Sequence, residues 1–536
     1  MNSNTDSRAP KLGEVLVAQG AITGKELALA LSRQLGIPCV DLNTCVIEPE
    51  ALRLIPESVA KECCAIPLCI TNGTANALKV AMADPNDILK LDTLQLYAKM
   101  RIALVVAPAE DIIEAIVRSY RSYTEIEKQF AGDGESKTSA KVKITDNSIT
   151  KAPAVRALDL LIEEALKSRA SDIHIETEEN QVRVRVRIDG VLHQIVSLPL
   201  SAHDQILSRL KVLSNMDIGD HRPQDGQFSF EANGRQVDVR VATIPTAYGE
   251  MGTLRLLDKS FALRKLTELG FSPDNLIKYE QMLASPFGMI LISGPTGSGK
   301  TTTLYASLNG LDRKTRKIIT VEDPIEYHLQ GINQIQVNPR AKLTFSSGLR
   351  SIMRHDPDVI LVGEIRDADT AAIAVQAANT GHLVLASVHA NDTVGVLLRL
   401  IDLGVEPFLV ASALIGIVAQ RMVRRVCPYC QHEVAVPQAE AQAYYEEIGE
   451  ERTKFTYGTG CNRCAGTGYL GRVAVFECLF MSEAIARLVA SGANAQQIRA
   501  KAKEEGVVSM RQDGMLKVKA GITTPTDILQ NVFSIR

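Results

Sequence analysis

The sequence predicts a multidomain α/β protein whose largest domain is built on a sheet of buried strands. The chain has 536 residues, enough for three or four domains, and its hydrophobic content of 46% is ample for packed cores. Apolar runs of strand length recur at 289–292, 318–321, 359–362 and 383–388, and glycine, acidic residues or histidine follow them. Residues of these types at the carboxyl ends of parallel strands lie where open α/β sheets bind ligands.

The charge balance argues against a coat of nucleic acid. The chain has 59 basic and 62 acidic residues and a net charge of −3, so we expect no direct nucleic-acid partner. The polar N-terminus lacks the apolar core of a signal peptide, and the longest apolar stretch, 408–419, is too short to span a bilayer. These features predict a cytoplasmic protein, in which the ten cysteines are reduced thiols or metal ligands.

Residues 1–50 are predicted to form a helical segment. Between Lys11 and Gln34, two helical patterns flank Gly20, and Thr23 is placed to cap the second pattern. This spacing predicts a helical hairpin.

The next two segments differ in texture. Residues 51–124 contain short apolar runs followed by a helical stretch, which predicts a small α/β domain. Residues 125–152 are rich in Gly, Ser, Thr and Lys and poor in aromatics, so they predict a flexible linker. The part of the chain before this linker could then change its orientation relative to the rest.

Residues 153–262 predict a smaller α+β domain with a basic strand. In V-R-V-R-V-R-I-D-G, the valines occupy one face of the strand and three arginines the other, and Asp189 and Gly190 form a hairpin turn. The three arginines are Arg183, Arg185 and Arg187. Because like charges repel, this face is expected to meet either solvent or an anion.

A glycine-rich loop, G-P-T-G-S-G-K-T-T, follows the run 289–292 and opens a predicted helix. Glycines let successive backbone N–H groups turn toward an anion, and the positive end of the helix points at the same charge. The loop therefore predicts a site for the phosphates of ATP. Lys300 is placed to reach the β- and γ-phosphates, and the Thr301 hydroxyl to bind Mg²⁺. The residues predicted to hold the nucleotide are Gly294, Pro295, Thr296, Gly297, Ser298, Gly299, Lys300, Thr301 and Thr302.

Two further apolar runs end in carboxylates. In T-V-E-D-P-I-E, Glu322, Asp323 and Glu326 are candidates to hold Mg²⁺ or its waters, with a simple exit from the strand as the alternative. In V-I-L-V-G-E, Glu364 would lie beside the phosphate loop if the two strands are neighbours. We predict that Glu364 polarises the attacking water.

Two histidines flank the run in T-G-H-L-V-L-A-S-V-H. His389 follows the strand at its carboxyl end and is a candidate sensor of the γ-phosphate, whereas His382 lies at the other end. A packing or hydrogen-bonding role is the alternative for both.

The predicted nucleotide site changes the interpretation of the arginines in residues 153–262. An ATPase that works as a ring needs cations to neutralise the γ-phosphate of a neighbouring subunit. We therefore interpret Arg185 and Arg209 as candidates for this catalytic role, with Arg222 and Arg240 as further ones.

Two C-x-x-C pairs lie about 30 residues apart near the end of the chain. Four thiolates at this spacing can close a tetrahedral Zn²⁺ site, and because all four positions are sulfur, the metal is predicted to be structural. A redox pair is the weaker alternative. The predicted zinc ligands are Cys427, Cys430, Cys461 and Cys464. The other cysteines, Cys39, Cys45, Cys63, Cys64, Cys69 and Cys478, are predicted to be packing residues.

Together these motifs resemble those of type II secretion and type IV pilus assembly ATPases, over nearly the full length of the chain. The family's Walker A motif falls on 294–301, its aspartate box on 318–326, its Walker B motif on 360–367 with the catalytic glutamate at Glu364, and its histidine box on 380–392. Its tetracysteine zinc motif falls on the two cysteine pairs.

The resemblance implies a fold, cofactors and partners. It implies a RecA-like P-loop ATPase domain over 263–536, with a zinc-binding subdomain at 425–466, a smaller α+β domain before it and an N-terminal α/β docking region. It implies ATP, Mg²⁺ and Zn²⁺ as cofactors and a homo-hexamer in which ATP hydrolysis moves adjoining domains. It also implies docking to an inner-membrane platform protein and its cytoplasmic, membrane-anchored partner, and so a location peripheral to the inner membrane.

The sequence departs from the family in two places. Met251 follows Gly249 and Glu250 where the family usually has Arg or Lys, which puts one cation in doubt, although Arg255 is retained. Some members bind cyclic di-GMP through two copies of the N-terminal pattern. Here one copy is present, with Lys11 in place of the usual Arg, which favours a structural role over nucleotide sensing.

Three functions can be compared. We expect a motor that assembles a pilus or pseudopilus. A pilus retraction motor is disfavoured, because such motors usually lack the long N-terminal region and the zinc module. A non-hydrolysing, nucleotide-gated scaffold is disfavoured because Lys300, Thr301 and Glu364 are intact.

Overall fold

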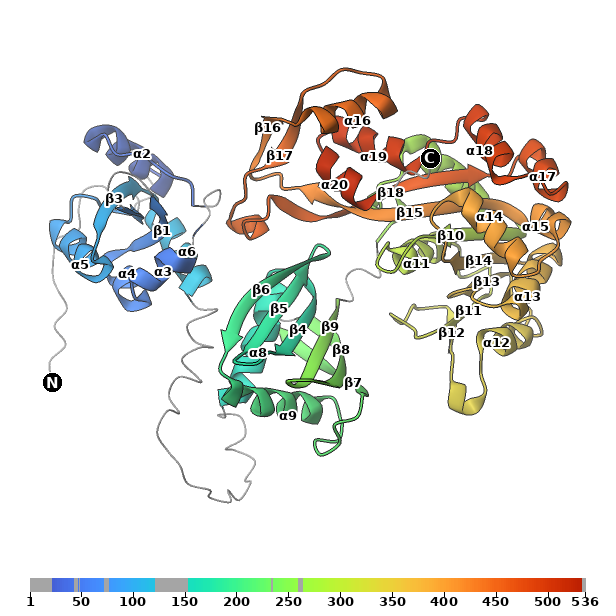
Figure 1. Ribbon diagram of the computed structural model, residues 1–536, viewed down its shortest axis with the longest axis horizontal. Helices are drawn as coiled ribbons and strands as arrows, with labels where there is room; N and C mark the ends of the chain where they lie inside the picture. Colours follow the sequence, from blue (N-terminus) through green and yellow to red (C-terminus); the bar gives the residue numbers. More distant parts are fainter. Residues whose placement is uncertain are drawn as a thin grey trace. The chain divides into compact units, whose positions relative to one another are not determined.

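The computed structural model describes residues 22–42, 47, 49–71, 77–120, 153–232, 235–258 and 264–532 (Figure 1). The predicted linker, the first half of the predicted helical hairpin and Cys45 lie outside the described residues. The chain forms two compact units. The first unit comprises residues up to 256 together with 427–431 and 458–470, and the second comprises the rest.

The N-terminal part of the first unit contains a three-stranded sheet in the order β1-β2-β3, with β1 and β2 antiparallel and β2 and β3 parallel. Its elements are α2 (Gly24–Leu35), α3 (Pro49–Leu54), α4 (Glu57–Cys63), β1 (Ala65–Thr71), β2 (Ala77–Met82), α5 (Ile88–Ala98), β3 (Arg101–Val106) and α6 (Ala109–Tyr120). Thr23 caps α2 in a reciprocal capping box with Glu26, as predicted. The prediction that Cys39 is a packing residue is wrong, because this side chain is exposed.

A six-stranded sheet follows, in the order β6-β5-β4-β9-β8-β7. Its elements are α8 (Pro153–Lys167), β4 (Ala170–Thr177), β5 (Val182–Ile188), β6 (Val191–Leu198), α9 (His203–Leu213), β7 (Gln224–Ala232), β8 (Arg235–Thr246) and β9 (Gly249–Asp258). The valines of β5 are buried in the core that α8 and α9 cover. Asp189 and Gly190 have positive φ angles of 49° and 92° and join β5 to β6 as the predicted hairpin.

The second unit is built on a seven-stranded sheet in the order β12-β11-β13-β14-β10-β15-β18. The central pairs, from β12 to β15, are all parallel. Its strands are β10 (Gly288–Ser293), β11 (Ile318–Glu322), β12 (Asn333–Gln336), β13 (Val359–Val362), β14 (Leu383–Val388), β15 (Leu414–Val426) and β18 (Tyr469–Phe480). The residues of β10, β11, β13 and β14 are buried on both faces, which is typical of parallel strands covered by helices.

Helices cover both faces of this sheet (Figure 1). They are α10 (Pro273–Leu283), α11 (Lys300–Gly310), α12 (Phe345–Ile352), α13 (Ala368–Asn379), α14 (Thr393–Asp402), α15 (Pro407–Ala413), α17 (Glu483–Ala490) and α18 (Ala495–Glu504). Beside it lie a two-stranded sheet, β16 (Gln431–Ala435) with β17 (Lys454–Gly458), and the helices α16 (Gln438–Ile448), α19 (Met510–Lys519) and α20 (Pro525–Asn531).

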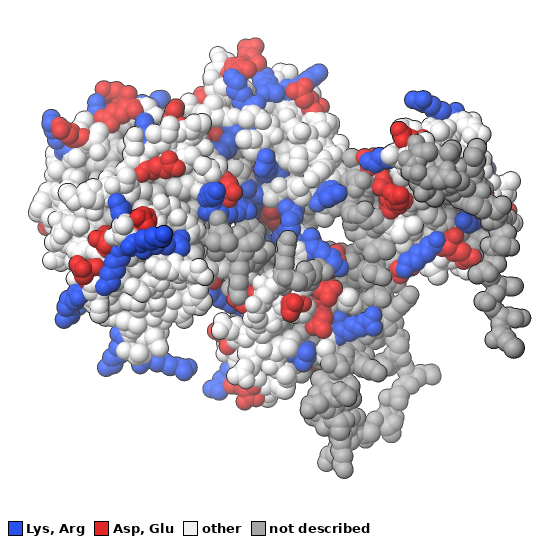
Figure 2. Space-filling model, turned by 180° about the vertical axis from the view of Figure 1, so that it is seen from behind, with Lys and Arg blue, Asp and Glu red and all other residues white. Residues whose placement is uncertain are grey.

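The distribution of surface charge and the lengths of the described helices are consistent with the near-neutral net charge and the short apolar stretches of the sequence. Figure 2 shows Lys and Arg interspersed with Asp and Glu over the visible face, without a field of one sign. Among the described helices, none combines the length and apolar character needed to cross a membrane.

Candidate active site and metal centre

The phosphate loop joins β10 to α11, so the predicted order of strand, glycine loop and helix is present. Gly294, Gly297 and Gly299 have φ angles of 150°, 78° and 87°, which L side chains rarely adopt. A Cβ atom on Gly294 would lie 2.3 Å from the backbone oxygen of Gln420, so no larger residue fits there. The first turn of α11 presents its free N–H groups at the end of this loop.

The Lys300 side chain is folded onto the loop. Its Nζ donates to the backbone oxygen of Gly294 at 2.7 Å and to that of Pro295 at 3.2 Å. Burial lowers the pKa of the Lys300 amine, and the negative charge of Glu364 opposes this effect. The Glu364 carboxylate therefore lies close enough to Lys300 for the two charges to interact.

Glu364 follows β13 and lies between two basic side chains. Its Oε1 is 2.8 Å from Nε2 of His389, and its Oε2 accepts a 2.6 Å hydrogen bond from Arg366. The Glu364 side chain is 14% exposed, against 48% for His389 and 61% for Arg366. The Glu364 carboxylate is thus mostly shielded from solvent, whereas its two partners are more exposed.

The strands of Glu364 and the phosphate loop are not neighbours, which corrects the arrangement considered from the sequence. β14 lies between β13 and β10. The two sites still meet, because parallel strands bring their carboxyl ends to one edge. Ser293, at the end of β10, exchanges two hydrogen bonds with Ala390, so the loop that carries His389 is tied to the strand before the phosphate loop.

Asp358 and His382 lie at the other edge of the sheet, before the amino ends of β13 and β14. Asp358 precedes β13 and accepts a hydrogen bond from the backbone N–H of Lys317 at 2.6 Å. His382 precedes β14, and its Nδ1 lies 2.9 Å from the backbone oxygen of Ala377. Asp358 therefore holds the chain just before β11, whereas His382 contacts the last turn of α13.

Glu322 ends β11 and is buried in a network of neutral donors. Its Oε2 accepts from the Tyr305 hydroxyl on α11, and its Oε1 accepts from Thr320 and from Gln334 Nε2. Burial, followed by the Glu322 charge, raises the pKa of the Tyr305 phenol. Both Glu322 oxygens are thus already occupied. By contrast, Asp323 is exposed.

Replacing Tyr305 by phenylalanine is expected to destabilise the protein by about 1–3 kcal/mol, because a buried carboxylate oxygen loses its donor. Thermal or urea unfolding measures the effect. The matched control is Tyr279→Phe, which removes a buried hydrogen bond to the neutral Ser307 hydroxyl and should cost only about 0.5–1.5 kcal/mol. Equal losses in the two variants would contradict a special role for the Tyr305–Glu322 contact.

The arginines of β5 meet anions, one of the two outcomes expected, and these anions are carboxylates of the protein itself. Arg185 donates to Glu176 at 2.6 Å, and Arg183 contacts the same carboxylate at 3.3 Å. Arg187 lies 3.8 Å from Asp172, which also pairs with Arg255. The acidic residues come from β4, the antiparallel neighbour of β5. Cross-strand pairs of opposite charge remove the repulsion.

The remaining basic candidates lie in different settings. The Arg209 Nε is buried, without a hydrogen-bond partner in the described part of the chain, and the Arg209 charge acts on Asp159 of α8. Arg222 is 85% exposed and pairs with Asp220. Met251 lies in β9 beside the buried Glu250, which pairs with Lys211 at 2.8 Å.

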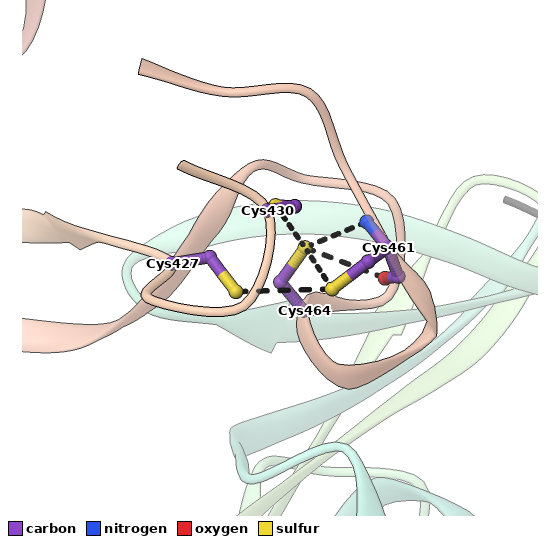
Figure 3. A group of neighbouring side chains, drawn as sticks. All are labelled: Cys427, Cys430, Cys461 and Cys464. Carbon is purple, nitrogen blue, oxygen red and sulfur yellow. Dashed lines mark hydrogen bonds between the residues drawn. The ribbon is translucent and has the colours of Figure 1, made fainter. Parts of the chain in front are cut away.

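The four predicted zinc ligands form one cluster (Figure 3). Their sulfur atoms lie within 4.8 Å of one another, with separations of 3.8 Å for Cys427 and Cys461, 3.9 Å for Cys430 and Cys464, and 3.7 Å for Cys461 and Cys464. A tetrahedral Zn²⁺ site with Zn–S bonds of about 2.3 Å requires sulfur separations of about 3.8 Å. Backbone N–H groups of Cys461 and Gly468 donate to the Cys464 sulfur. The donor set and its spacing therefore fit zinc.

Several side chains at these sites were not predicted. Arg366, Tyr305 and Gln420 each touch a predicted residue, and nothing in the local sequence pattern marks Tyr305 or Gln420. Arg366 alone carried a signal, because it lies two residues after Glu364 in the same segment. The other two contacts join residues that are 17 or more positions apart.

A parallel sheet with a phosphate loop, a carboxylate at the carboxyl end of another strand and a group of four cysteines that could hold a metal ion is typical of a P-loop ATPase. The sequence model of the type II/IV secretion system protein family matches residues 147–533, and the MshEN domain model matches 35–125. The chain therefore belongs to the type II/IV secretion system protein family and is an ATPase of its secretion and pilus assembly class.

Three comparisons illustrate this membership. The type IV pilus assembly ATPase PilB of Myxococcus xanthus is 38% identical over 97% of this chain and 93% of its own length. The type II secretion system protein E of Pseudomonas aeruginosa is 39% identical over 89% of this chain and 96% of its own length. The structure of the Legionella pneumophila ATPase DotB is 21% identical, with a TM-score of 0.52 over 73% of this chain and 97% of DotB, and shows the shared fold.

Proposed function

We propose that this protein hydrolyses ATP to power assembly of a type IV pilus or a type II secretion pseudopilus. It would act through an inner-membrane platform protein and that protein's cytoplasmic, membrane-anchored partner, at the cytoplasmic side of the inner membrane. The carrying observation is that the intact phosphate loop after β10 and Glu364 after β13 lie at the same edge of one parallel sheet, where Ser293 binds the loop that carries His389, the partner of Glu364. Full-length relatives named as pilus assembly and type II secretion proteins support the assembly role.

The phosphate loop is proposed to hold the nucleotide. Backbone N–H groups within residues 294–302, of which Pro295 has none, would bind the phosphates, and the Thr301 hydroxyl would hold Mg²⁺, which neutralises phosphate charge when bound. In the structure the Lys300 amine uses backbone oxygens of Gly294 and Pro295 as acceptors. On ATP binding it exchanges them for the more negative β- and γ-phosphate oxygens.

Glu364 is proposed to orient and polarise the attacking water. Both of its oxygens contact basic side chains, so at least one contact must open before the carboxylate can accept a hydrogen bond from water. His389 is the proposed sensor, because an imidazole that turns from Glu364 toward the γ-phosphate would release this oxygen. Glu322 anchors the acidic segment through its buried network. Asp323 and Glu326 are the proposed holders of Mg²⁺ or its waters.

The proposed active assembly is a homo-hexamer in which a neighbouring subunit supplies an arginine. Arg185 and Arg209 remain the candidates, and Arg185 would have to leave Glu176 to reach a phosphate. Zn²⁺ is proposed to fix the two cysteine loops. For the N-terminal segment, residues 1–50, we propose a structural role rather than cyclic di-GMP sensing, and for residues 51–124 a docking role.

The test is phosphate release by the purified full-length protein, alone and with its membrane partner. Hydrolysis that increases when the co-purified partner is added supports an assembly motor. A protein that binds ATP but releases no phosphate even with the partner would instead be a nucleotide-gated scaffold. Pilus or pseudopilus loss in a deletion strain distinguishes assembly from retraction, since loss of a retraction motor leaves filaments in place.

A further inference from the structure

The side chain of Gln420 lies directly behind the phosphate loop. Gln420 is on β15, next to β10, and is fully buried. Its Nε2 donates to the backbone oxygen of Ser298 at 2.7 Å, and its Oε1 accepts from the Thr303 hydroxyl at 2.8 Å. One amide therefore connects the loop, the first turn of α11 and the neighbouring strand.

We propose that Gln420 is a positioning residue that sets the direction of the Ser298–Gly299 peptide. The peptide unit is planar and trans, so its C=O and N–H point to opposite sides. Because the Ser298 oxygen is held toward Gln420, the N–H of Gly299 faces the opposite side of the loop, where phosphate binds. Within the described residues, no hydrogen bond uses this N–H.

The surroundings leave the loop little freedom to turn this peptide over. Gly299 has a φ angle of 87°, and a Cβ built on it would lie 3.3 Å from both Gln420 Nε2 and Met422 Sδ. The Gln420 backbone oxygen also borders Gly294, at the other end of the loop. Residues 420 and 422 lie on one face of β15 and thus support the loop from behind.

The chemistry at this position requires an amide. The Ser298 oxygen needs a donor and the Thr303 hydroxyl needs an acceptor, and a primary amide supplies both at one side-chain length. A carboxylate would face a carbonyl oxygen with no proton to share, and an apolar side chain would leave two buried polar groups without partners. Gln420→Glu is therefore expected to turn the peptide, whereas Gln420→Leu only releases it.

This inference rests on the proposed ATP site. The phosphate oxygen that accepts from Gly299 belongs to both ATP and ADP, so the affinity for both nucleotides should fall together. A hydrogen bond to a charged group is worth about tenfold or more in affinity. We expect Gln420→Glu to weaken ATP and ADP binding by about tenfold or more, with a similar rise in KM and a kcat at saturation within about threefold of wild type.

The experiment measures fluorescent ATP and ADP binding to the full chain, and then KM and kcat. Val423→Ala is the matched control, because it removes packing from the same strand on the face away from the loop and should leave Kd and KM unchanged. Thr303→Val, which removes one of the two hydrogen bonds, should shift Kd by about two- to fivefold. If Gln420→Glu does not fold, the nucleotide affinities of Thr303→Val and Gln420→Leu test the proposal instead.

The outcomes are distinguishable. Wild-type nucleotide affinity in the folded Gln420 and Thr303 variants overturns the positioning role. A lower melting temperature or kcat with unchanged KM also overturns it, since that pattern indicates a purely structural residue. If the wild-type protein binds ATP but does not hydrolyse it, the proposed function is wrong. The nucleotide affinities of the variants still test the positioning role of Gln420 in that case.

Discussion

Replacing Glu364 by glutamine should lower the kcat for ATP hydrolysis by about 100-fold or more, the usual contribution of a positioned general base. Glutamine keeps the size of the side chain and can still hydrogen-bond to its neighbours, but its amide cannot take a proton from water. ATP binding should survive, because the phosphate loop is unchanged. Steady-state phosphate release and a nucleotide-binding titration measure the two properties.

The matched control for this prediction is Asp358→Asn. Asp358 precedes the same strand at its opposite end and binds the Lys317 backbone, so its loss should affect stability slightly and hydrolysis little. A Glu364→Gln protein that retains more than half of the wild-type kcat, or that no longer binds ATP, would contradict the role assigned to this carboxylate.

The sequence predicted motifs that lie within one short segment. It did not predict contacts between side chains that are distant in the sequence. The phosphate loop and the cysteine pairs each lie in short segments whose spacing follows from the ligand. The cross-strand carboxylates Asp172 and Glu176 escaped detection because pairing with the arginines depends on strand register, which has a local irregularity between Ala170 and Asp172.

The order of the strands in the seven-stranded sheet could not be predicted from the sequence either. The apolar runs predicted buried strands, but nothing in them shows that β14 lies between β13 and β10. Gln420 illustrates the same point, because its contact with Ser298 spans 122 positions and exists only once β15 lies beside β10. The apolar sequence around Gln420 does not by itself indicate a role for this residue.

Replacing Cys461 by serine should abolish stoichiometric zinc binding and unfold the two cysteine loops. The four thiolates are buried, and metal-binding free energy in such small modules is folding free energy. Elemental analysis should find about one zinc per wild-type chain and far less in the variant. Limited proteolysis should cut the variant within 427–470 and should leave this segment intact in wild type.

Cys478→Ser is the control for the thiol chemistry. Cys478 is a buried cysteine outside the cluster, so this variant should keep its zinc and its protease resistance. Removing the metal from wild type with a strong chelator should reproduce the Cys461→Ser pattern. An unchanged proteolytic pattern after complete removal of zinc would show that the metal does not hold the loops.

The most direct test is a structure of the assembled protein with a non-hydrolysable ATP analogue and Mg²⁺. We predict that the Lys300 amine leaves the Gly294 oxygen for the β- and γ-phosphates, and that Glu364 contacts a water in line with the γ-phosphate. A complex in which Lys300 stays on the loop carbonyls, with Glu364 still bound to Arg366 and away from that phosphate, would contradict the catalytic arrangement.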